Sequence, residues 1–485
     1  MWIHCAKNHC IGVAPHNTGT LGVSILISTE KQSIRGGSIM KRKTKSIVSF
    51  ILFAALMGSL FVGCGSNDQN AAVGSQQNTT TVEQQSSTAE VKEPVTLKFQ
   101  SCIVTKNSGD LIEKLSQEYS ETHPNVKVEI EMTPWANYTD KIINSVASGV
   151  VPDGAVAKFT WYPTLKDHLE PIDEFFNNWK YKDEVEPIIL DQYRSVTPEK
   201  KLYFLPYTNG ALFFYYRKDL FEEAGITKTP DTWDEFLEDA IKLTKDKDGD
   251  GKIDQYGYTM RSAANGHETW YCFAFANMKQ PSFYNEKGDF SFISPEITEG
   301  NQFFLDLFKK VKVVPPTAPT DGTNENVAYL KSGQAAMMIQ SVQQSVALKG
   351  ALGDKVGVFK IPAGKNGKRF VGGGETSFVT FKESKIKEEV FNFESWLLEP
   401  EQHRRIVATG DTEVFMASVK DEIIKDNIFQ AISVESLPDL QFAPPNPYMA
   451  QFGATDWPAI ISKGLLTDIT SEEICKELQK KLFPD

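Results

Sequence analysis

Residues 95–132, VTLKFQSCIVTKNSGDLIEKLSQEYSETHPNVKVEIEM, contain the pattern that decides the fold class. At both ends of this stretch apolar residues alternate with polar ones, which is typical of a β-strand with one buried face. Between them, Leu111, Ile112, Leu115 and Tyr119 lie on one face of a predicted helix. The order strand, helix, strand predicts a parallel sheet in an α/β domain.

The same kinds of element recur farther along the chain. TWDEFLEDAIKLT (232–244) predicts a helix that starts with a capping box of Thr232 and Glu235. Its apolar face consists of Phe236, Ala240 and Leu243. YGYTM (256–260) is predicted to be a strand, and residues 299–310 and 389–407 are predicted to be helices.

Length and charge limit the class of protein. A chain of 485 residues is too long for one small core and predicts two lobes or domains. The 51 Lys and Arg residues against 63 Asp and Glu residues give a net charge of −12. This balance argues against a nucleic-acid partner or an anionic-lipid surface and favours a small neutral or cationic ligand.

The N-terminal region predicts export. MKRKTKSIVSFILFAALMGSLFVGCGS (40–66) has basic residues, an apolar run and small residues around Cys64, so residues 40–63 are predicted to be a signal peptide. LFVGC resembles a bacterial lipobox, which implies lipidation of Cys64 and anchoring on the extracytoplasmic face of the cell membrane. The alternative is a transmembrane anchor, for which the apolar run is short.

The segments on either side of this signal have different predicted origins. Residues 1–39 are predicted to be an upstream extension from a misassigned start. Residues 64–93, rich in Ser, Thr, Gln and Asn, are predicted to be a disordered tether. The remaining thiols, Cys102, Cys272 and Cys475, form no disulfide framework or metal pair by their spacing.

Three segments resemble a known family. They are SQEYSETHPNVKVEIEMTPWANYTDKIINSVASGVVPD (116–153), LPYTNGALFFYYRKDLFEEAGITKTPDTWDEFLEDAIKLT (205–244) and YLKSGQAAMMIQ (329–340). Their order and spacing are similar to those of the extracellular solute-binding proteins of bacterial ABC importers, family 1, typified by maltose-binding protein. Arg217 stands where this family usually has Asn.

The resemblance implies an α/β, two-lobed periplasmic-binding-protein-like fold (type II), with interleaved lobes joined by a hinge. It places one lobe at 95–208 plus 360–410 and the other at 212–356 plus 411–485. It also implies a monomer that closes around a mono- or oligosaccharide and delivers it to the membrane permease subunits of an ABC importer. A binding protein for a non-sugar small polar solute is one alternative function.

First-lobe ligand contacts are expected where predicted strands end. Sugar sites combine aromatic faces with amides and carboxylates, and open α/β sheets bind ligands at the carboxyl ends of strands. AKFTWYP (157–163) occupies such an end, so Lys158, Phe159 and Trp161 are expected to contact the ligand. The alternative is that one of these rings packs inside the lobe.

Other contacts are implied by position in the family. His267, Glu268 and Trp270 lie in ANGHETWY (264–271), whose alternative is a surface loop. Asn209 lies beside the hinge, where the alternative is a turn residue. The remaining expected contacts are Gln343 in QSVQQ, Gly374 and Glu375 in FVGGGETSFV, and Phe452 and Trp457 in YMAQFGATDWP, with core packing the alternative for the last two.

A secreted carbohydrate-active hydrolase is the rival class, because paired carboxylates beside aromatics also describe a glycosidase. No GxSxG, HExxH or Cys/His nucleophile pattern occurs, and the seven His residues are not at ligand spacing. We therefore expect a binding protein, not an enzyme, with no required cofactor.

DKDGDGKIDQYG (246–257) resembles a calcium loop. Compared with an EF-hand, it supplies Asp246, Asp248, Asp250, the carbonyl of Lys252 and Asp254, but position twelve is Gly257 in place of Glu. A predicted strand follows, so a calcium ion would be structural and not a switch. The alternative is an acidic turn without metal.

Overall fold

The computed structural model describes residues 93–103, 106–195, 197–285 and 287–484. The predicted extension, signal peptide, lipidated Cys64 and nearly all of the tether lie outside these residues. Within them, no helix is both long enough and apolar enough to span a bilayer.

The first sheet confirms the predicted strand, helix, strand order. β1 (Val95–Ser101) pairs in parallel with β2 (Val126–Met132) along its whole length and with β3 (Gly154–Ala157). β10 (Thr376–Thr380) runs antiparallel between β3 and β4 (Leu205–Thr208), which gives the order β2-β1-β3-β10-β4. One late segment is thus built into a sheet of early strands.

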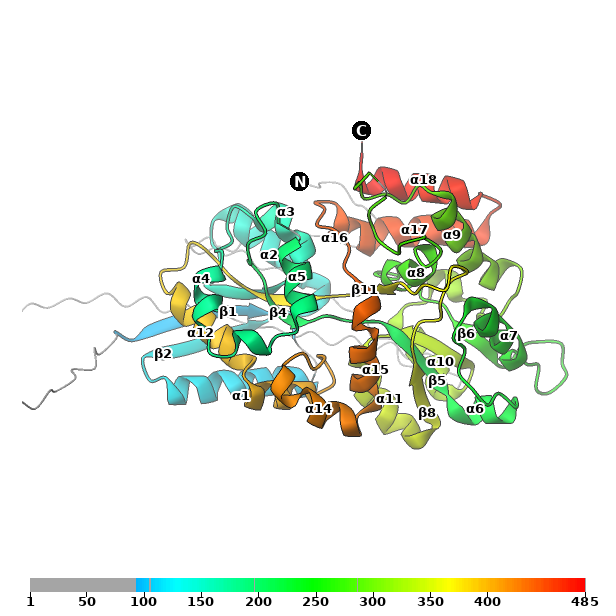
Figure 1. Ribbon diagram of the computed structural model, residues 1–485, viewed down its shortest axis with the longest axis horizontal. Coiled ribbons are helices and arrows are strands. Elements are labelled where there is room, and N and C mark those ends of the chain that lie inside the picture. The colour runs from blue at the N-terminus through cyan, green and yellow to red at the C-terminus, as the bar shows by residue number, and fades with distance from the viewer. Residues whose placement is uncertain (1–92, 104–105, 196, 286, 485) are drawn as a thin grey trace, which may run out of the picture. The chain divides into compact units, whose positions relative to one another are not determined.

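Helices pack around this sheet (Figure 1), and their buried side chains belong to a hydrophobic core that continues around the second sheet. In α1 (Lys106–Thr122), Ile112, Leu115 and Tyr119 are buried, as their spacing predicts. Tyr119 packs edge-on against Phe393 of a helix far along the chain. The other helices of this region are α2 (Trp135–Ser148), α3 (Tyr162–Leu165), α4 (Asp173–Asn178), α5 (Pro187–Ser195), α12 (Lys387–Leu397) and α13 (Pro400–Val407).

The second sheet is built from the middle of the chain. β6 (Tyr256–Thr259) pairs in parallel with β7 (Ala335–Gln340), and β5 (Phe213–Arg217) runs antiparallel to β7 and β8 (Val356–Phe359). Its order is β6-β7-β5-β8. The surrounding helices are α6 (Lys218–Glu223), α7 (Trp233–Leu243), α8 (His267–Ala274), α9 (Pro295–Lys309), α10 (Thr323–Ser332), α11 (Ser345–Leu352), α17 (Trp457–Leu466) and α18 (Ser471–Leu482).

Helix α7 shows how local sequence sets an element. Thr232 Oγ1 accepts the Glu235 N–H at 3.3 Å, as a capping residue does. The Glu235 carboxylate accepts the Asp231 N–H at 2.8 Å, so the reciprocal bond falls one residue before the position expected for a capping box. Phe236, Ala240 and Leu243 are fully buried, which confirms the predicted apolar face.

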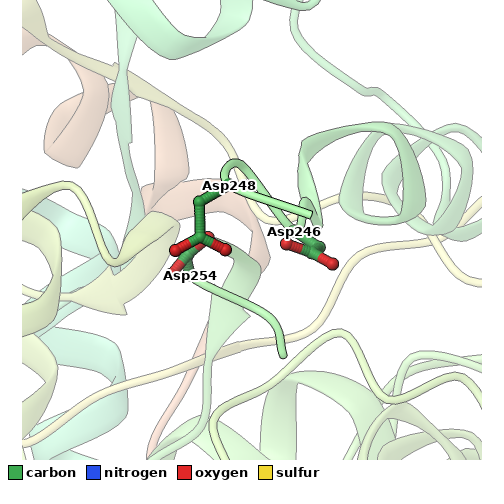
Figure 2. A group of neighbouring side chains, drawn as sticks. All are labelled: Asp246, Asp248 and Asp254. Atoms are coloured by element: carbon green, nitrogen blue, oxygen red, sulfur yellow. The ribbon is translucent and has the colours of Figure 1, made fainter. Parts of the chain in front are cut away.

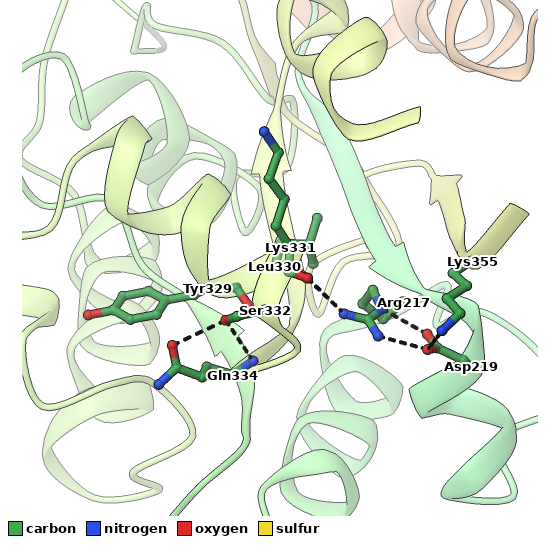
Figure 3. Close-up of polar contacts among 8 residues, drawn as sticks. All are labelled: Arg217, Asp219, Tyr329, Leu330, Lys331, Ser332, Gln334 and Lys355. Carbon is green, nitrogen blue, oxygen red and sulfur yellow. Dashed lines mark hydrogen bonds and ion pairs between the residues drawn. The ribbon is translucent and has the colours of Figure 1, made fainter. Parts of the chain in front are cut away.

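Arg217, the departure from the family pattern, has a structural role. Its guanidinium binds both carboxylate oxygens of Asp219, at 2.8 and 2.7 Å (Figure 3). It also donates at 3.1 Å to the carbonyl of Leu330 in the last turn of α10. The carbonyls of a last helical turn have no partner inside their helix. The Leu330 carbonyl accepts the N–H of the C-cap residue Gly333 at 3.3 Å as well as Arg217, and the bond to Arg217 fixes α10 to β5.

The chain crosses between the two sheets at several places. β4 ends at Thr208 in the first sheet, and β5 begins at Phe213 in the second. β8 ends at Phe359, and β10 begins at Thr376. Between these two strands, β9 (Val371–Gly372) pairs in parallel with β11 (Leu440–Gln441) in a small separate sheet.

The C-terminal segments contact both regions. α15 (Ile428–Ser436) places Phe429 against Tyr215 of β5, with ring centroids 5.7 Å apart. Phe442 packs edge-on against Phe159, at 5.1 Å. The other elements here are α14 (Ala417–Asp426), α16 (Met449–Gln451) and a π-helical turn at Phe452–Asp456.

Candidate functional site

A cavity of about 350 Å³ lies where strands of both sheets end. On the first sheet, its lining residues follow β1 and β3, end β4 and begin the antiparallel β10. From the second it receives residues that follow β6 and β7. This is the position expected for a ligand in open α/β sheets.

The wall of the cavity is polar. Its lining residues are Cys102, Ile103, Lys158, Tyr207, Thr208, Gly210, Leu212, Arg261, Asn265, Glu268, Thr323, Gln340, Ser341, Gln343, Gln344, Gly374, Thr376 and Asp411. Two cations, Lys158 and Arg261, face two carboxylates, Glu268 and Asp411, so the formal charges of the lining cancel. Four side-chain amides and four hydroxyl residues other than Tyr207 complete the polar groups.

Glu268 joins the two halves of this wall. Its Oε1 lies 3.6 Å from Lys158 Nζ, which follows β3 of the first sheet. Its Oε2 lies 3.4 Å from Arg261 Nη1, which follows β6 of the second. Arg261 Nη2 also donates to the Ala264 carbonyl at 3.0 Å, which fixes the guanidinium. One carboxylate is therefore held between cations from both sheets.

The electrostatics keep Glu268 charged. Burial raises the pKa of this carboxyl, but attraction to Lys158 and Arg261 outweighs burial and holds its pKa below the ordinary value. Glu268 is therefore an ionised hydrogen-bond acceptor at neutral pH. Such charge-assisted acceptors form stronger bonds to hydroxyl donors than neutral groups do.

The connection between β4 and β5, beside the cavity, contains a close contact between two backbone segments. Gly210 has φ +59°, and a Cβ built on it would lie 2.6 Å from the carbonyl oxygen of Gly374. Only glycine fits this left-handed conformation at that distance. The buried Glu413 accepts hydrogen bonds from the Thr208 hydroxyl and, at 3.1 Å, from the Asn209 N–H, so the crossing is held from both sides.

Four of the predicted ligand contacts line the cavity: Lys158, Glu268, Gln343 and Gly374. Gln343 is exposed to solvent in the short 3-10 turn Val342–Gln344 before α11, and Gly374 presents its backbone beside Glu268. These four residues come from separate segments of the chain, and the fold brings them to one wall. Their roles in binding stay a prediction.

The predicted stacking aromatics do not line the cavity, and the structure corrects this expectation. Phe159, Trp270, Phe452 and Trp457 have no exposed surface, and Trp161 keeps 6%. Phe159 packs between Tyr193 and Phe442. Phe452 and Trp457 surround the ring of His267, and Trp270 donates from Nε1 to Asn301 Oδ1 at 2.9 Å. Their ring faces are occupied by protein.

Three further predicted contacts are buried behind the wall. Asn209 Oδ1 accepts the Ala211 N–H at 2.9 Å, as a turn residue does. Burial lowers the pKa of His267 to about 4, so its ring is neutral. Burial raises the pKa of Glu375 to about 7 in spite of nearby Lys158. None of the three is among the residues that line the cavity.

Several residues that line the cavity are not among the ligand contacts predicted from the sequence. Arg261 follows the predicted strand at 256–260, and Gln340 ends the strand of YLKSGQAAMMIQ. The rule that strand ends bind ligands, applied to Lys158, would have found both. Tyr207 and Asp411 carried no comparable signal, because their place depends on how the crossings pack.

The acidic loop follows α7 and is exposed to solvent at residues 247–254, and Figure 2 shows three of its carboxylates. Carboxylate oxygens of Asp246, Asp248 and Asp254 lie within 4.8 Å of one another. Asp250 does not join them, because its carboxylate accepts the Lys252 N–H at 2.8 Å and lies 3.3 Å from the Lys252 ammonium. Asp246 accepts the N–H groups of Gly249 and Gly251, so the turn also has internal support.

Calcium binding at this loop stays a prediction with a direct test. If calcium binds, a hundredfold excess over its dissociation constant should stabilise the protein by about 2.7 kcal/mol, and Asp248→Asn should abolish that gain. Calorimetry and thermal unfolding with and without chelator measure both, with Asp421→Asn as an exposed control. Equal melting temperatures in calcium and chelator would leave the metal-free turn as the correct interpretation.

Comparisons with known proteins agree on fold. A solute-binding protein from Thermotoga lettingae solved with α-D-tagatose superposes with a TM-score of 0.67 at 22% identity, covering 81% of this chain and 99% of that one. A binding protein of Brucella abortus (strain 2308) is 27% identical over 343 residues, 70% of this chain and 80% of its own. The mannitol-binding protein of Pseudomonas aeruginosa is 26% identical over 249 residues, covering 49% and 54%.

The fold is that of two-lobed binding proteins. The sequence model for bacterial extracellular solute-binding proteins matches residues 105–404, more than half of the chain. This protein therefore belongs to the bacterial extracellular solute-binding protein family.

Proposed function

We propose that this protein captures a neutral carbohydrate in the cavity and presents it to the permease of an ABC importer. The observation that carries the proposal is the ionised Glu268, held between Lys158 and Arg261 in a wall of amides and hydroxyls. Sugar hydroxyls both donate and accept, and such a wall offers carboxylate acceptors, cationic donors and amides that do both. The names of relatives that bind mannitol or tagatose support the same class of ligand.

The charge balance of the wall favours a sugar over a charged solute. Lys158 and Arg261 are offset by Glu268 and Asp411 within the lining itself. A polyamine or an organic anion would bring a net charge that this balanced wall does not neutralise. Burying an unpaired charge is costly, so a neutral polyhydroxy ligand fits best.

The two glutamates near the cavity do not make the geometry of a hydrolase. Glu268 is ionised and Glu375 has a pKa of about 7, and such a split is typical of a nucleophile and an acid. However, Glu375 is 2% exposed and does not line the cavity, so its carboxyl does not reach a ligand there. Family membership also favours binding without turnover.

The Glu268→Gln variant tests the proposal. A thermal-shift screen of sugars and sugar alcohols first finds a ligand, and calorimetry then gives its affinity. Loss of the charged acceptor should weaken binding by roughly 10- to 100-fold, while Glu472→Gln, at an exposed pair with Lys476, should leave it unchanged. The sugar recovered afterwards should be intact, and its cleavage would contradict the binding function.

We also propose that lipidated Cys64 anchors the protein to the extracytoplasmic face of the membrane. Support comes from the basic and apolar sequence at 40–63 and from the Ser-, Thr-, Gln- and Asn-rich sequence at 64–93. Cys64→Ala should release the protein from the membrane fraction and remove fatty-acid label. Retention of both in the variant would refute the anchor.

A further inference from the structure

We infer that the cavity holds a single small polyhydroxy unit, a monosaccharide or a sugar alcohol, and that the Tyr207 hydroxyl is one of its hydrogen-bond partners. This inference rests on the proposed function and narrows it, because carbohydrate binding alone leaves both short and long sugars open. Size, wall chemistry and unpaired polar groups carry it.

The first observation is size. The cavity measures about 350 Å³, which is near the lower end of the roughly 300–1,000 Å³ common for ligand sites. Its walls come from both sheets, with Thr208 and Thr376 on one side and Gln340 and Ser341 on the other. A ligand that satisfies both sides has to be short.

The second observation is that flat apolar surface is scarce. Among the side chains that the structure describes, Tyr207 is the only aromatic one in the lining. The rings expected to stack on a sugar chain pack against protein instead, as those of Phe159 and Trp270 do. Without aromatic planes, each added sugar ring would gain little contact while still being ordered on binding.

The third observation is a pair of polar atoms in the wall. The hydroxyl of Tyr207 and Nε of Arg261 are buried and have no hydrogen-bond partner among the described residues. Tyr207 lines the cavity with 3% of its surface exposed, and its hydroxyl lies just beneath that wall, so a ligand bonds it only when the wall shifts on binding. An unpaired buried polar group is costly, and a ligand rich in hydroxyls supplies the missing partners.

Together these features describe a site that recognises hydroxyls by hydrogen bonding. Amides from Asn265, Gln340, Gln343 and Gln344 add donors and acceptors around Glu268. A site of this kind rejects analogues that lack a bonded hydroxyl far more strongly than an apolar pocket rejects a change of shape. Among compounds small enough for the cavity, specificity should therefore follow hydroxyl configuration.

A length series tests the inference on the whole folded protein. Calorimetry is run with D-glucose, D-tagatose and D-mannitol, and with maltose, maltotriose and maltotetraose. We expect saturable heat for at least one of the small compounds and none for the tri- and tetrasaccharide at the same concentrations. Tighter binding of a longer sugar would overturn the inference and leave the proposed function standing. Binding of none of these, nor of any sugar in the screen, would refute the proposed function itself.

A matched pair of variants tests the role of Tyr207. Tyr207→Phe should weaken the small ligand by roughly 2- to 10-fold without lowering the melting temperature, because the hydroxyl has no protein partner. Tyr271 also has a buried unpaired hydroxyl but does not line the cavity, so Tyr271→Phe should change neither quantity. Unchanged affinity in Tyr207→Phe would contradict the contact assigned to this hydroxyl.

Discussion

Gly210→Ala should destabilise the folded protein by about 2–5 kcal/mol and weaken ligand binding at the same time. The left-handed backbone, φ +59°, costs an L-residue roughly 1–2 kcal/mol. In addition, the new methyl would lie 2.6 to 2.8 Å from the N, C and O atoms of Gly374, and overpacking of this kind costs about 1–3 kcal/mol. Because both glycines line the cavity, relief of the clash has to move its wall.

Gly225→Ala is the matched control for this effect. Gly225 also has a left-handed conformation, φ +68°, but a Cβ built there meets nothing within 4 Å. We therefore expect only the backbone cost, about 1 kcal/mol, and no change in affinity. Chemical denaturation and ligand titration of both variants measure the difference. Equal changes in stability and affinity in the two variants would show that the close approach of Gly374 adds nothing to the cost of a side chain at Gly210.

Trp270→Ala should lower the free energy of unfolding by about 3–5 kcal/mol, as deletion of a fully buried large ring does. Trp270 has no exposed surface, and its indole N–H bonds Asn301 Oδ1. Asn301 in turn donates to Ser471 Oγ at 2.8 Å, so the ring also supports the contact between α9 and α18. Denaturant unfolding followed by circular dichroism gives the stability change.

A second substitution at this position, Trp270→Phe, separates a core role from a ligand contact. Trp270→Phe keeps most of the ring but leaves the Asn301 acceptor unpaired, so a loss of about 1–3 kcal/mol is expected. It should bind the ligand with unchanged affinity, because Trp270 does not line the cavity. Tyr284→Ala, at a ring that is 48% exposed, should have a small effect on stability. Stability equal to the parent in Trp270→Ala would contradict the packing described here.

Parts of the candidate site could be predicted because local sequence carried the signal. Lys158 follows a buried strand, and strand ends are where such sheets bind ligands. The family resemblance added Glu268, Gln343 and Gly374, and all three line the cavity. The same strand-end rule applies to Arg261 and Gln340 and would have predicted both.

The aromatic residues could not be assigned in the same way. Residues two positions apart on a helix point in nearly opposite directions. Helix α8 begins at His267, so when Glu268 faces the cavity, Trp270 faces the core. The family segment identified the helix, but its start and rotation decided which side chain reaches the ligand. Phe159 likewise sits one residue after Lys158 and turns inward.

The sequence by itself determined the α/β fold class, because alternating and helical apolar spacing follow directly from strand and helix geometry. It also determined family membership, through segments whose order is read along the chain. Only the tertiary structure decided the wall of the cavity, since that wall joins residues from Cys102 to Asp411 across two sheets. The physical reason is that the side-chain directions and burial of these residues depend on long-range packing, which no short stretch of sequence contains.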